Sequence, residues 1–463
     1  MVDLTQQSLA EVACLIESRE ASPVDVTEAC LDRISRTEET LNSFITVMAD
    51  EAGRDAATAA KEIASGNYRG PLHGVPVGLK DLVAVSGVRM TAGSKIMADH
   101  IADEDAEIAR RFRAAGAVIM GKLNMHEFAY GATGINPHYG SARNPWSVKQ
   151  ITGGSSSGSG SAVAAGQCFA AIGTDTGGSI RIPASLCGVV GVKPTFGLVS
   201  RRGIVPLSWS LDHVGPLTRT VEDAAIVLQV IAGHDPLDDS SANEPVPDYR
   251  AGLRDGVRGL RVGVPEGFFF DGLEDEVEVA VRAAIETLKA EGAAVSSISL
   301  PRIDEIPNAV TAIMLPEALA YHQKWLNERP DDYGESVRFR LELAATIPAV
   351  TYVQAQRFRE IVVREWREQV FSQVDVLACP TTAVSAPAID QSELSTTFNL
   401  IRLTNPLNLL GTPCVSLPCG FTKAGLPIGL QLVGRWFDEA TVLRAAFAYE
   451  QATDWHKRRP ALD

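Results

Sequence analysis

The chain has 463 residues, of which 45% are hydrophobic and 21% are charged, and its formal net charge at pH 7 is -15. This length and composition predict a globular protein with a large core, and the negative charge argues against nucleic acid as a partner, because phosphate binding needs clustered Lys and Arg. The N-terminus does not resemble a signal peptide, and no stretch reaches the roughly 18 uncharged apolar residues of a membrane span, so we expect a cytoplasmic protein.

Residues 1–60 are predicted to form a helical N-terminal segment. Ser22 is placed as the N-cap and Pro23 as the first residue of a helix whose apolar face continues through residue 34. An Ala-rich run after Met48 continues the helical pattern. A single larger domain is expected to follow over residues 61–463.

Helix and strand signals alternate in this larger domain. Strands are predicted at 74–85, 117–124, 293–300 and 374–382, two further strands about a turn within 413–434, and helices at 104–116 and 275–292. The order predicts an α/β fold with a mixed β-sheet core covered by helices on both faces. The acidic, Pro-bearing stretch 233–256 is predicted to be a surface excursion of this domain.

Two glycine-rich runs, ITGGSSSGSGSAVAAG at 151–166 and GTDTGGSIRIPA at 173–184, stand close together. Such composition is typical of a flexible linker, but both runs continue directly into Ala-rich and apolar sequence that is typical of a buried helix and strand. Glycine lets the main chain approach a ligand closely. We therefore expect a ligand to lie against this backbone, near Ser179.

Three short motifs are incomplete. A P-loop needs a lysine after its glycines, and residues 153–162 contain none. The pattern GxSxG at 154–158 nominates Ser156, but the preceding NPWSVKQIT is a poor strand, so a nucleophile elbow lacks its context. An HExxH zinc pattern begins at His126 and fails at Tyr130, and no cysteine spacing resembles a zinc site. Neither a metal nor a cofactor is predicted, and the seven cysteines are expected to be reduced.

Lysine and serine chemistry remains, with Lys80 after a strand, Ser155 in the first glycine run and Ser179 in the second. A serine hydroxyl needs a base before it is a good nucleophile, and Ser–Lys arrangements supply one. A lysine with its usual pKa near 10.4 is charged at pH 7, but burial can lower that pKa by about 3 to 5 units. Asp81 would oppose this shift, yet neighbouring side chains of a strand point to opposite faces.

The chain resembles the amidase signature family of serine amidohydrolases. The resemblance covers about residues 60–435 in the family's order and rests on these stretches: GPLHGVPVGLKD, GKLNMHEFAYG, NPW, GGSSSGSGSAVAAG, GTDTGGSIRIPASLCGVVGVKPTFGLVSRRG, SLDHVGPLTRTVEDAA, PTT and GLPIGLQLVG. It implies the amidase signature fold and hydrolysis of carboxylic amides, with esters or carbamates reacting by the same steps.

The resemblance also implies the roles of the site residues. Ser179 would be the acylating nucleophile, Ser155 the bridging serine and Lys80 the base. The oxyanion hole would consist of the backbone N–H groups of Thr176, Gly177, Gly178 and Ser179. Losing one oxyanion donor costs roughly 3 to 4 kcal/mol of barrier in other enzymes, so glycines that open this backbone to a substrate carbonyl are worth their entropic cost.

Other residues receive less specific interpretations. An apolar substrate pocket could be lined by Met125, Phe128, Tyr130, Ile135 and Trp209. Arg181 is expected to brace the nucleophile loop or pair with a carboxylate, Asp175 and Asp212 to accept hydrogen bonds from backbone N–H groups, and Cys187 to pack in the core.

The sequence departs from the family's usual pattern at several positions: Thr152, Ser157, His126 and His213. His126 stands where the glutaminyl-tRNA amidotransferase A subunits usually have aspartate, and residues 398–413 contain no acidic residue where those subunits hold the glutamine amine. A desolvated ammonium needs such a partner.

Three hypotheses remain open. The first is a stand-alone amidase acting on small or aryl amides as a monomer or homodimer, and the departures above favour it. The second is the glutamine-hydrolysing A subunit of an aminoacyl-tRNA amidotransferase, which would need partner subunits. The third is a non-catalytic scaffold, and the presence of Lys80, Ser155 and Ser179 argues against it.

Overall fold

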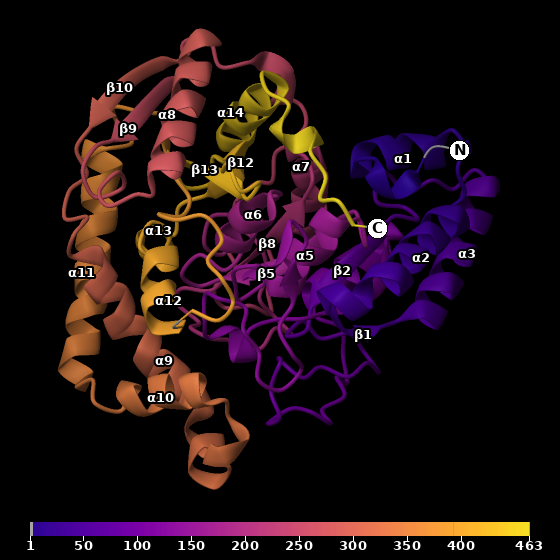
Figure 1. Ribbon diagram of the computed structural model, residues 1–463, viewed down its shortest axis with the longest axis horizontal. Helices are drawn as coiled ribbons and strands as arrows, with labels where there is room; N and C mark the ends of the chain where they lie inside the picture. Colours follow the sequence, from indigo (N-terminus) through magenta and orange to yellow (C-terminus); the bar gives the residue numbers. More distant parts are fainter. Residues whose placement is uncertain (1–2, 392, 463) are drawn as a thin grey trace.

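The computed structural model describes residues 3–391 and 393–462, and in this part of the chain one 11-stranded mixed sheet forms the centre of a single domain (Figure 1). The strands lie in the order β1-β3-β2-β6-β8-β7-β12-β13-β11-β9-β10. Their bounds are β1 Phe44–Val47, β2 Pro76–Lys80, β3 Val118–Leu123, β6 Ala170–Asp175, β7 Val190–Lys193, β8 His213–Thr218, β9 Arg261–Pro265, β10 Ala294–Ile298, β11 Val376–Pro380, β12 Cys414–Phe421 and β13 Pro427–Gly434.

Helices cover both faces of the sheet, as the α/β prediction requires (Figure 1). Their bounds are α1 Leu9–Glu17, α2 Pro23–Leu41, α3 Ala49–Ala64, α4 Glu107–Ala115, α5 Ser157–Ala165, α6 Arg181–Cys187, α7 Val221–Ile231, α8 Asp275–Ala290, α9 Ile306–Glu328, α10 Glu335–Ala344, α11 Ala349–Gln369, α12 Glu393–Ile401, α13 Pro406–Leu410 and α14 Glu439–Gln451. None of the helices in the described residues is long and apolar enough to cross a membrane.

Local signals set several helix ends as predicted. The Ser22 side chain accepts a hydrogen bond from Val24 N–H and Pro23 is the first residue of α2. α4 ends at Gly116, whose φ of 76° lies in the left-handed region that favours glycine. The hairpin of β12 and β13 also lies where two strands about a turn were predicted.

The N-terminal segment contains a strand that the sequence analysis missed. β1 pairs antiparallel with β3, with Phe44 opposite Leu123, and so extends the central sheet beyond β3. At four residues it is too short to show a clear period-2 pattern between two strong helix signals. The helical prediction for residues 1–60 therefore covers α1, α2 and most of α3, but not this edge of the sheet.

Two other strand predictions need correction. The strand predicted over 74–85 ends at Lys80, because the chain then turns and Asp81 accepts hydrogen bonds from the Thr91 backbone and hydroxyl. The segment NPWSVKQIT, interpreted as a poor strand, contains β5 Ser147–Ile151, which pairs with β4 Arg143–Asn144 in a separate two-stranded sheet.

The stretch 233–256 runs along the body of the domain and is fastened to the loop before β8. The Ser200 hydroxyl donates to Asp235 at 2.7 Å, Arg201 N–H donates to Asp238 at 2.7 Å, and Ala242 N–H donates to the Gly197 carbonyl at 2.9 Å. These bonds hold the stretch against the protein surface.

Two buried carboxyl groups fasten the N-terminal helix, α7 and α14 together. Asp223 accepts a hydrogen bond from Ala10 N–H, and Glu450 accepts one from Val221 N–H. Burial raises the pKa of Asp223 to about 6 and that of Glu450 to about 8. Since both pKa values lie above those of the unfolded chain, the neutral forms are the ones that the fold stabilises.

We expect stability to fall as the pH rises through these two folded-state pKa values. The Glu450 contribution is fully present below its unfolded pKa near 4.3 and is lost above about 8. Glu450→Gln keeps an acceptor for Val221 N–H and stays neutral, so it should match the wild type near pH 4, below the unfolded pKa of Glu450, and melt a few degrees higher at pH 9. Thermal unfolding at both values checks this. An equal difference between the two proteins at both values would contradict the assignment.

Candidate active site

The candidate site lies at one edge of the sheet, where the parallel strands β2 and β6 end. Lys80 is the last residue of β2, and Thr174 lies near the end of β6. The Lys80 Nζ lies 2.7 Å from Ser155 Oγ, 3.0 Å from Ser156 Oγ and 2.9 Å from Thr174 Oγ1. A fully buried amine therefore faces three hydroxyl groups.

The surroundings of Lys80 favour its neutral form. Burial lowers the pKa of Lys80 to about 7, although the carboxylates of Asp212 and Asp175 act in the opposite direction. Asp81 does not face this amine, because its carboxylate lies 3.3 Å from Nζ of Lys122, and both side chains are fully buried. The predicted separation is present, but its cause differs: Asp81 follows the end of β2 and is held away from Lys80 by its bonds to Thr91 and its ion pair with Lys122. A lysine of this kind can accept a proton near pH 7.

The two glycine-rich runs meet beside Lys80. Ser155 lies in the loop before α5, and Ser179 lies between β6 and α6. Ser156 N–H donates to the Ser179 carbonyl at 3.3 Å, and His126 N–H donates to the Ser155 carbonyl at 3.0 Å. Ser179 is 8% exposed, whereas Ser155 is fully buried. Ser179 is therefore nearer to solvent than Ser155, and Ser155 lies nearer to the lysine amine than Ser156 does.

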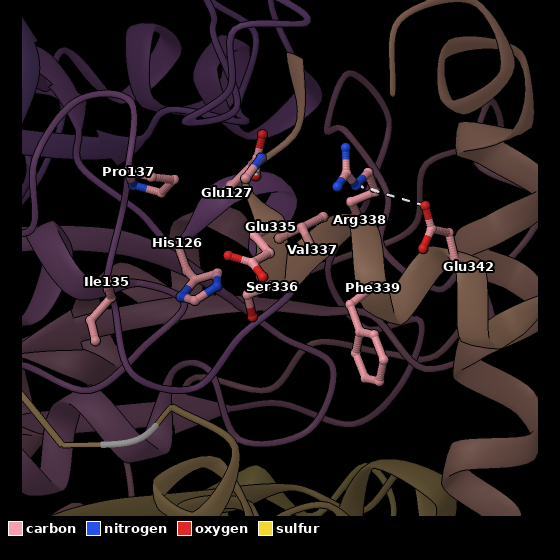
Figure 2. A pocket seen from close by; sticks show the side chains of 11 residues that line it. His126, Glu127, Ile135, Pro137, Glu335, Ser336, Val337, Arg338, Phe339 and Glu342 are labelled. Carbon is pink, nitrogen blue, oxygen red and sulfur yellow. Dashed lines mark hydrogen bonds and ion pairs between the residues drawn. The ribbon is translucent and has the colours of Figure 1, made fainter. Parts of the chain in front are cut away.

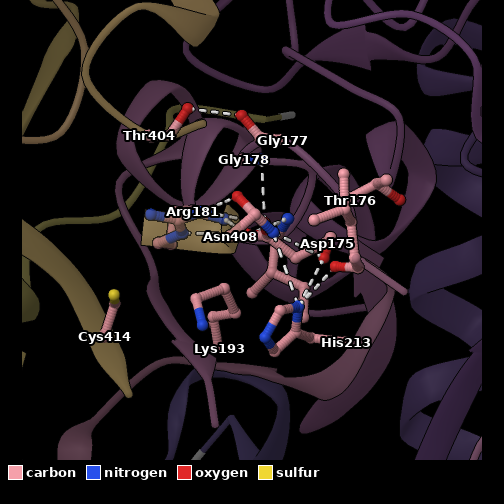
Figure 3. A network of polar contacts seen from close by, with 12 residues as sticks. Asp175, Thr176, Gly177, Gly178, Arg181, Lys193, His213, Thr404, Asn408 and Cys414 are labelled. Atoms are coloured by element: carbon pink, nitrogen blue, oxygen red, sulfur yellow. Dashed lines mark hydrogen bonds and ion pairs between the residues drawn. The ribbon is translucent and has the colours of Figure 1, made fainter. Parts of the chain in front are cut away.

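A buried ion pair fixes the loop that carries Ser179. Asp175 accepts hydrogen bonds from Arg181 Nη2 at 2.9 Å and Nε at 3.0 Å, from Gly178 N–H at 2.8 Å and from Ile180 N–H at 3.1 Å (Figure 3). Arg181 also donates to Asn408 and to Gln431. The Arg181 guanidinium holds the pKa of Asp175 well below its usual range despite the burial of both groups. The roles expected of Asp175 and Arg181 are therefore present in the structure.

Both ends of the peptide unit between Gly177 and Gly178 are held. The Thr404 hydroxyl donates to the Gly177 carbonyl at 2.6 Å, while Gly178 N–H donates to Asp175 (Figure 3). Because the Gly178 N–H is engaged in this hydrogen bond, it does not point to the role of oxyanion donor that was predicted for it. Its glycine is required for another reason, since its φ is 132° and a Cβ there would lie 2.2 Å from Thr404 Oγ1.

Asp212 and His213 support this loop from β8. Asp212 accepts hydrogen bonds from the Thr176 hydroxyl at 2.5 Å and from the Leu207 and Ser208 N–H groups. The His213 Nδ1–H faces the carbonyls of Leu211 at 2.7 Å and Asp175 at 3.1 Å. Burial lowers the pKa of His213 well below its usual value, so its ring is neutral.

The five predicted pocket residues do not form one pocket. Met125, Phe128 and Tyr130 are buried, and Phe128 packs edge-on against His322 of α9 with ring centroids 4.4 Å apart. Ile135 lines a cavity of about 560 Å³ together with His126, opposite the first turns of α10 (Figure 2). Trp209, 45% exposed, lines a second cavity of about 500 Å³, whose wall includes Thr174 and Asp212.

Several residues of the site were not expected from the sequence to belong to it. Ser156 and Thr174 contact the lysine, but each stands in a run where other Ser and Thr residues are equally near. Asn408 and Thr404 reach the loop from more than 220 residues away, as the separations of 233 and 227 positions show. Only folding brings them to this edge of the sheet. In the part of the chain that the structure describes, no group of three or more His, Cys, Asp or Glu side chains is placed to hold a metal ion.

The two glycines should respond differently to alanine. Gly178→Ala places a methyl group against Thr404 at a positive φ, so we expect a loss of about 1–3 kcal/mol in the free energy of unfolding. Among the described residues, a Cβ on Gly177 would meet only the Cβ of Asn405, at 3.7 Å, and Gly177→Ala should change stability by less than about 1 kcal/mol. Urea denaturation of both variants measures this, and equal losses would contradict the described loop.

Known proteins resemble this chain over its whole length. The Amidase family model matches residues 25–443. An amidase of Pseudomonas putida is 46% identical, covering 100% of this chain and 99% of that protein. The A subunit of the glutamyl-tRNA(Gln) amidotransferase of Roseiflexus sp. (strain RS-1) is 43% identical with the same coverage. The solved 6-aminohexanoate cyclic dimer hydrolase bound to its substrate superposes with a TM-score of 0.90 at 32% identity, covering 100% of both chains.

Proposed function

The chain belongs to the amidase family, whose members include amide-bond hydrolases, and from that premise we propose that it cleaves small carboxylic amides through an acyl-enzyme on Ser179. The observation that carries the proposal is the buried Lys80 amine, which has a pKa of about 7 and lies 2.7 Å from Ser155 Oγ. Such an amine is a base that can begin proton transfer to and from the nucleophile through Ser155.

The proposed cycle has two halves. Neutral Lys80 takes the Ser155 proton while Ser155 takes the Ser179 proton, and Ser179 Oγ attacks the amide carbon. As the C–N bond breaks, the proton returns from Lys80 through Ser155 to the leaving nitrogen, which departs as an amine. Water then attacks the ester carbon with the same proton relay, and the carboxylic acid leaves with Ser179 restored.

The developing oxyanion is proposed to accept hydrogen bonds from backbone N–H groups of Thr176, Gly177 and Ser179. The bonds from Thr404 and to Asp175 support this role, because they fix the peptide unit that connects Gly177 to Gly178 and so restrict the loop backbone on either side of it, where the Gly177 and Ser179 N–H groups lie. Preorganised donors of this kind lower a barrier more than mobile ones do.

The cavities favour a substrate with an apolar portion. Trp209, Pro206 and Leu237 line the cavity whose wall includes Thr174, the hydrogen-bond partner of Lys80. Ile135 lines the other cavity and packs against a buried apolar cluster that includes Ile182 and Leu186 of α6. We infer small alkyl or aryl amides as substrates, and esters or carbamates would follow the same steps.

A second candidate is the glutamine-hydrolysing A subunit of an aminoacyl-tRNA amidotransferase. The 43% identity to the Roseiflexus protein over the whole chain favours it. Against it stands the turn beside Gly177, which carries Thr404 and Asn405 after Ile401 and offers no carboxylate to a glutamine ammonium. The stand-alone hydrolase, a monomer or homodimer, is therefore the proposal.

Ser179→Ala should abolish amine release from aryl amides, with a loss of at least about 1,000-fold in kcat, since it removes the proposed nucleophile. Chromogenic anilides measure the release, and mass spectrometry locates the acyl adduct. Ser65→Ala, at an exposed serine after α3, is the control and should be fully active. An adduct at another residue would overturn the assignment, and turnover of L-glutamine alone would favour the amidotransferase function.

The pH dependence should follow Lys80. Because the base must be neutral and its pKa is about 7, kcat/KM should rise about tenfold per pH unit below pH 7 and level off above it. Lys80→Arg keeps the positive charge at all pH values and should lose at least about 100-fold in activity. Initial rates between pH 5 and 9 test this, and a rate that is level between pH 5 and 7 would argue against a lysine base.

A further inference from the structure

The turn between α12 and α13 is packed against the proposed oxyanion loop. Thr404 lies in this turn and donates its hydroxyl proton to the Gly177 carbonyl at 2.6 Å. Its other acceptor, the Ile401 carbonyl at 3.1 Å, already accepts N–H bonds from Thr404 and Asn405 at 3.0 and 2.9 Å. The single hydroxyl proton of Thr404 is therefore donated to the Gly177 carbonyl. This hydrogen bond fixes the turn between α12 and α13 beside the oxyanion loop (Figure 3).

The next residue, Asn405, lies at the open side of Gly177. Its Cβ is 3.7 Å from the point where a Cβ on Gly177 would lie, and within the described residues it is the only contact within 4 Å of that point. Gly177 is itself partly exposed. A substrate carbonyl bound by the Gly177 N–H would thus lie close to the Asn405 side chain.

The Asn405 side-chain oxygen has no role in the part of the fold that the structure describes. The residue is 6% exposed, and its Oδ1 is buried without a hydrogen-bond partner among the described residues. Asn405 occupies the N-cap position of α13, where asparagine usually accepts a helix N–H. Here its backbone is in the right-handed helical region, with φ −63° and ψ −31°, and its side chain makes no capping bond.

An unpaired buried oxygen destabilises the free protein, so its presence calls for a partner outside the chain. We propose that Asn405 is a substrate-binding residue that accepts a hydrogen bond from the acyl half of the substrate. The substrate class is an amide whose acyl group carries an N–H or O–H donor next to the scissile carbonyl. This inference rests on the proposed amidohydrolase function.

The acyl half is assigned to Asn405 by the direction of proton transfer. The leaving nitrogen receives its proton from Ser155 and so must face Ser155 and Lys80. Asn405 lies instead beside Gly177, where the carbonyl and its acyl substituent remain after the amine has left. A donor on that substituent can reach Asn405 in both halves of the cycle.

The test compares two 4-nitroanilides that differ by one hydroxyl group, the 2-hydroxypropanoyl and the propanoyl compound. Wild-type protein should prefer the hydroxyacyl compound by at least about 10-fold in kcat/KM, since a site with a buried polar group rejects an analogue that lacks its partner. Asn405→Leu, of similar size but without the acceptor, should bring the ratio close to 1 by slowing only the hydroxyacyl compound. Asn405→Asp keeps the acceptor and should retain the preference.

Two further measurements separate this inference from the fold and from the proposed function. Removing an unpaired buried oxygen should leave the melting temperature of Asn405→Leu unchanged or raised, whereas a structural role would lower it and slow both anilides equally. Labelling of Ser179 by a fluorophosphonate should proceed at the wild-type rate in this variant, and protection from labelling by each anilide measures binding where turnover is slow.

The outcomes are distinct. If neither protein is labelled at Ser179, the proposed function fails. If Ser179 is labelled but the wild type shows no preference between the anilides in turnover or protection, or if Asn405→Leu keeps the preference, the assignment of Asn405 is overturned and the hydrolase proposal stands.

Discussion

The buried ion pair between Asp175 and Arg181 is the interaction on which the candidate site depends. The two residues flank Ser179 in the chain, one at the end of β6 and the other at the start of α6. Burying an unsatisfied ion pair would be costly, but here Gly178 N–H, Ile180 N–H and Asn408 Nδ2 complete the hydrogen bonding of the carboxylate, and Asn408 and Gln431 accept from the guanidinium. Backbone N–H groups of the nucleophile loop thus supply hydrogen bonds that water would otherwise give to the Asp175 carboxylate, so the ion pair and the loop conformation stabilise each other.

Two buried lysines on neighbouring strands show how the partner of a charge determines its chemistry. Burial lowers the pKa of both, but Lys122 on β3 lies beside the Asp81 carboxylate, which counteracts part of that shift. Among the described residues, Lys80 on β2 has only hydroxyl groups at hydrogen-bonding distance, and burial lowers its pKa to about 7. The Asp81 carboxylate therefore favours the cation of Lys122, whereas Lys80 is suited to act as a base.

Much of this arrangement could be predicted from local sequence. Capping residues marked the ends of α2 and α4, and apolar runs located β3, β11, β12 and β13, because these features act within a few residues. The strands β1, β4, β5, β7, β8 and β9 were not predicted, since each is short and is stabilised by pairing with partner strands rather than by its own pattern. The predicted pocket residues do not lie together for a similar reason. Met125 and Phe128 are apolar, and only the packing of distant segments against them decides whether such residues are buried in the core or line a cavity.

The sequence by itself determined several of the elements, the α/β class and the candidate chemistry, because propensity, patterning and reactive side chains are properties of short segments. The tertiary structure alone decided which groups those side chains meet. It turned Asp81 toward Lys122, committed the Gly178 N–H to Asp175, and brought Thr404 and Asn405 to Gly177 across 227 positions of chain. Desolvation and hydrogen-bond geometry arise only when distant segments exclude water from one another, so no local pattern records them.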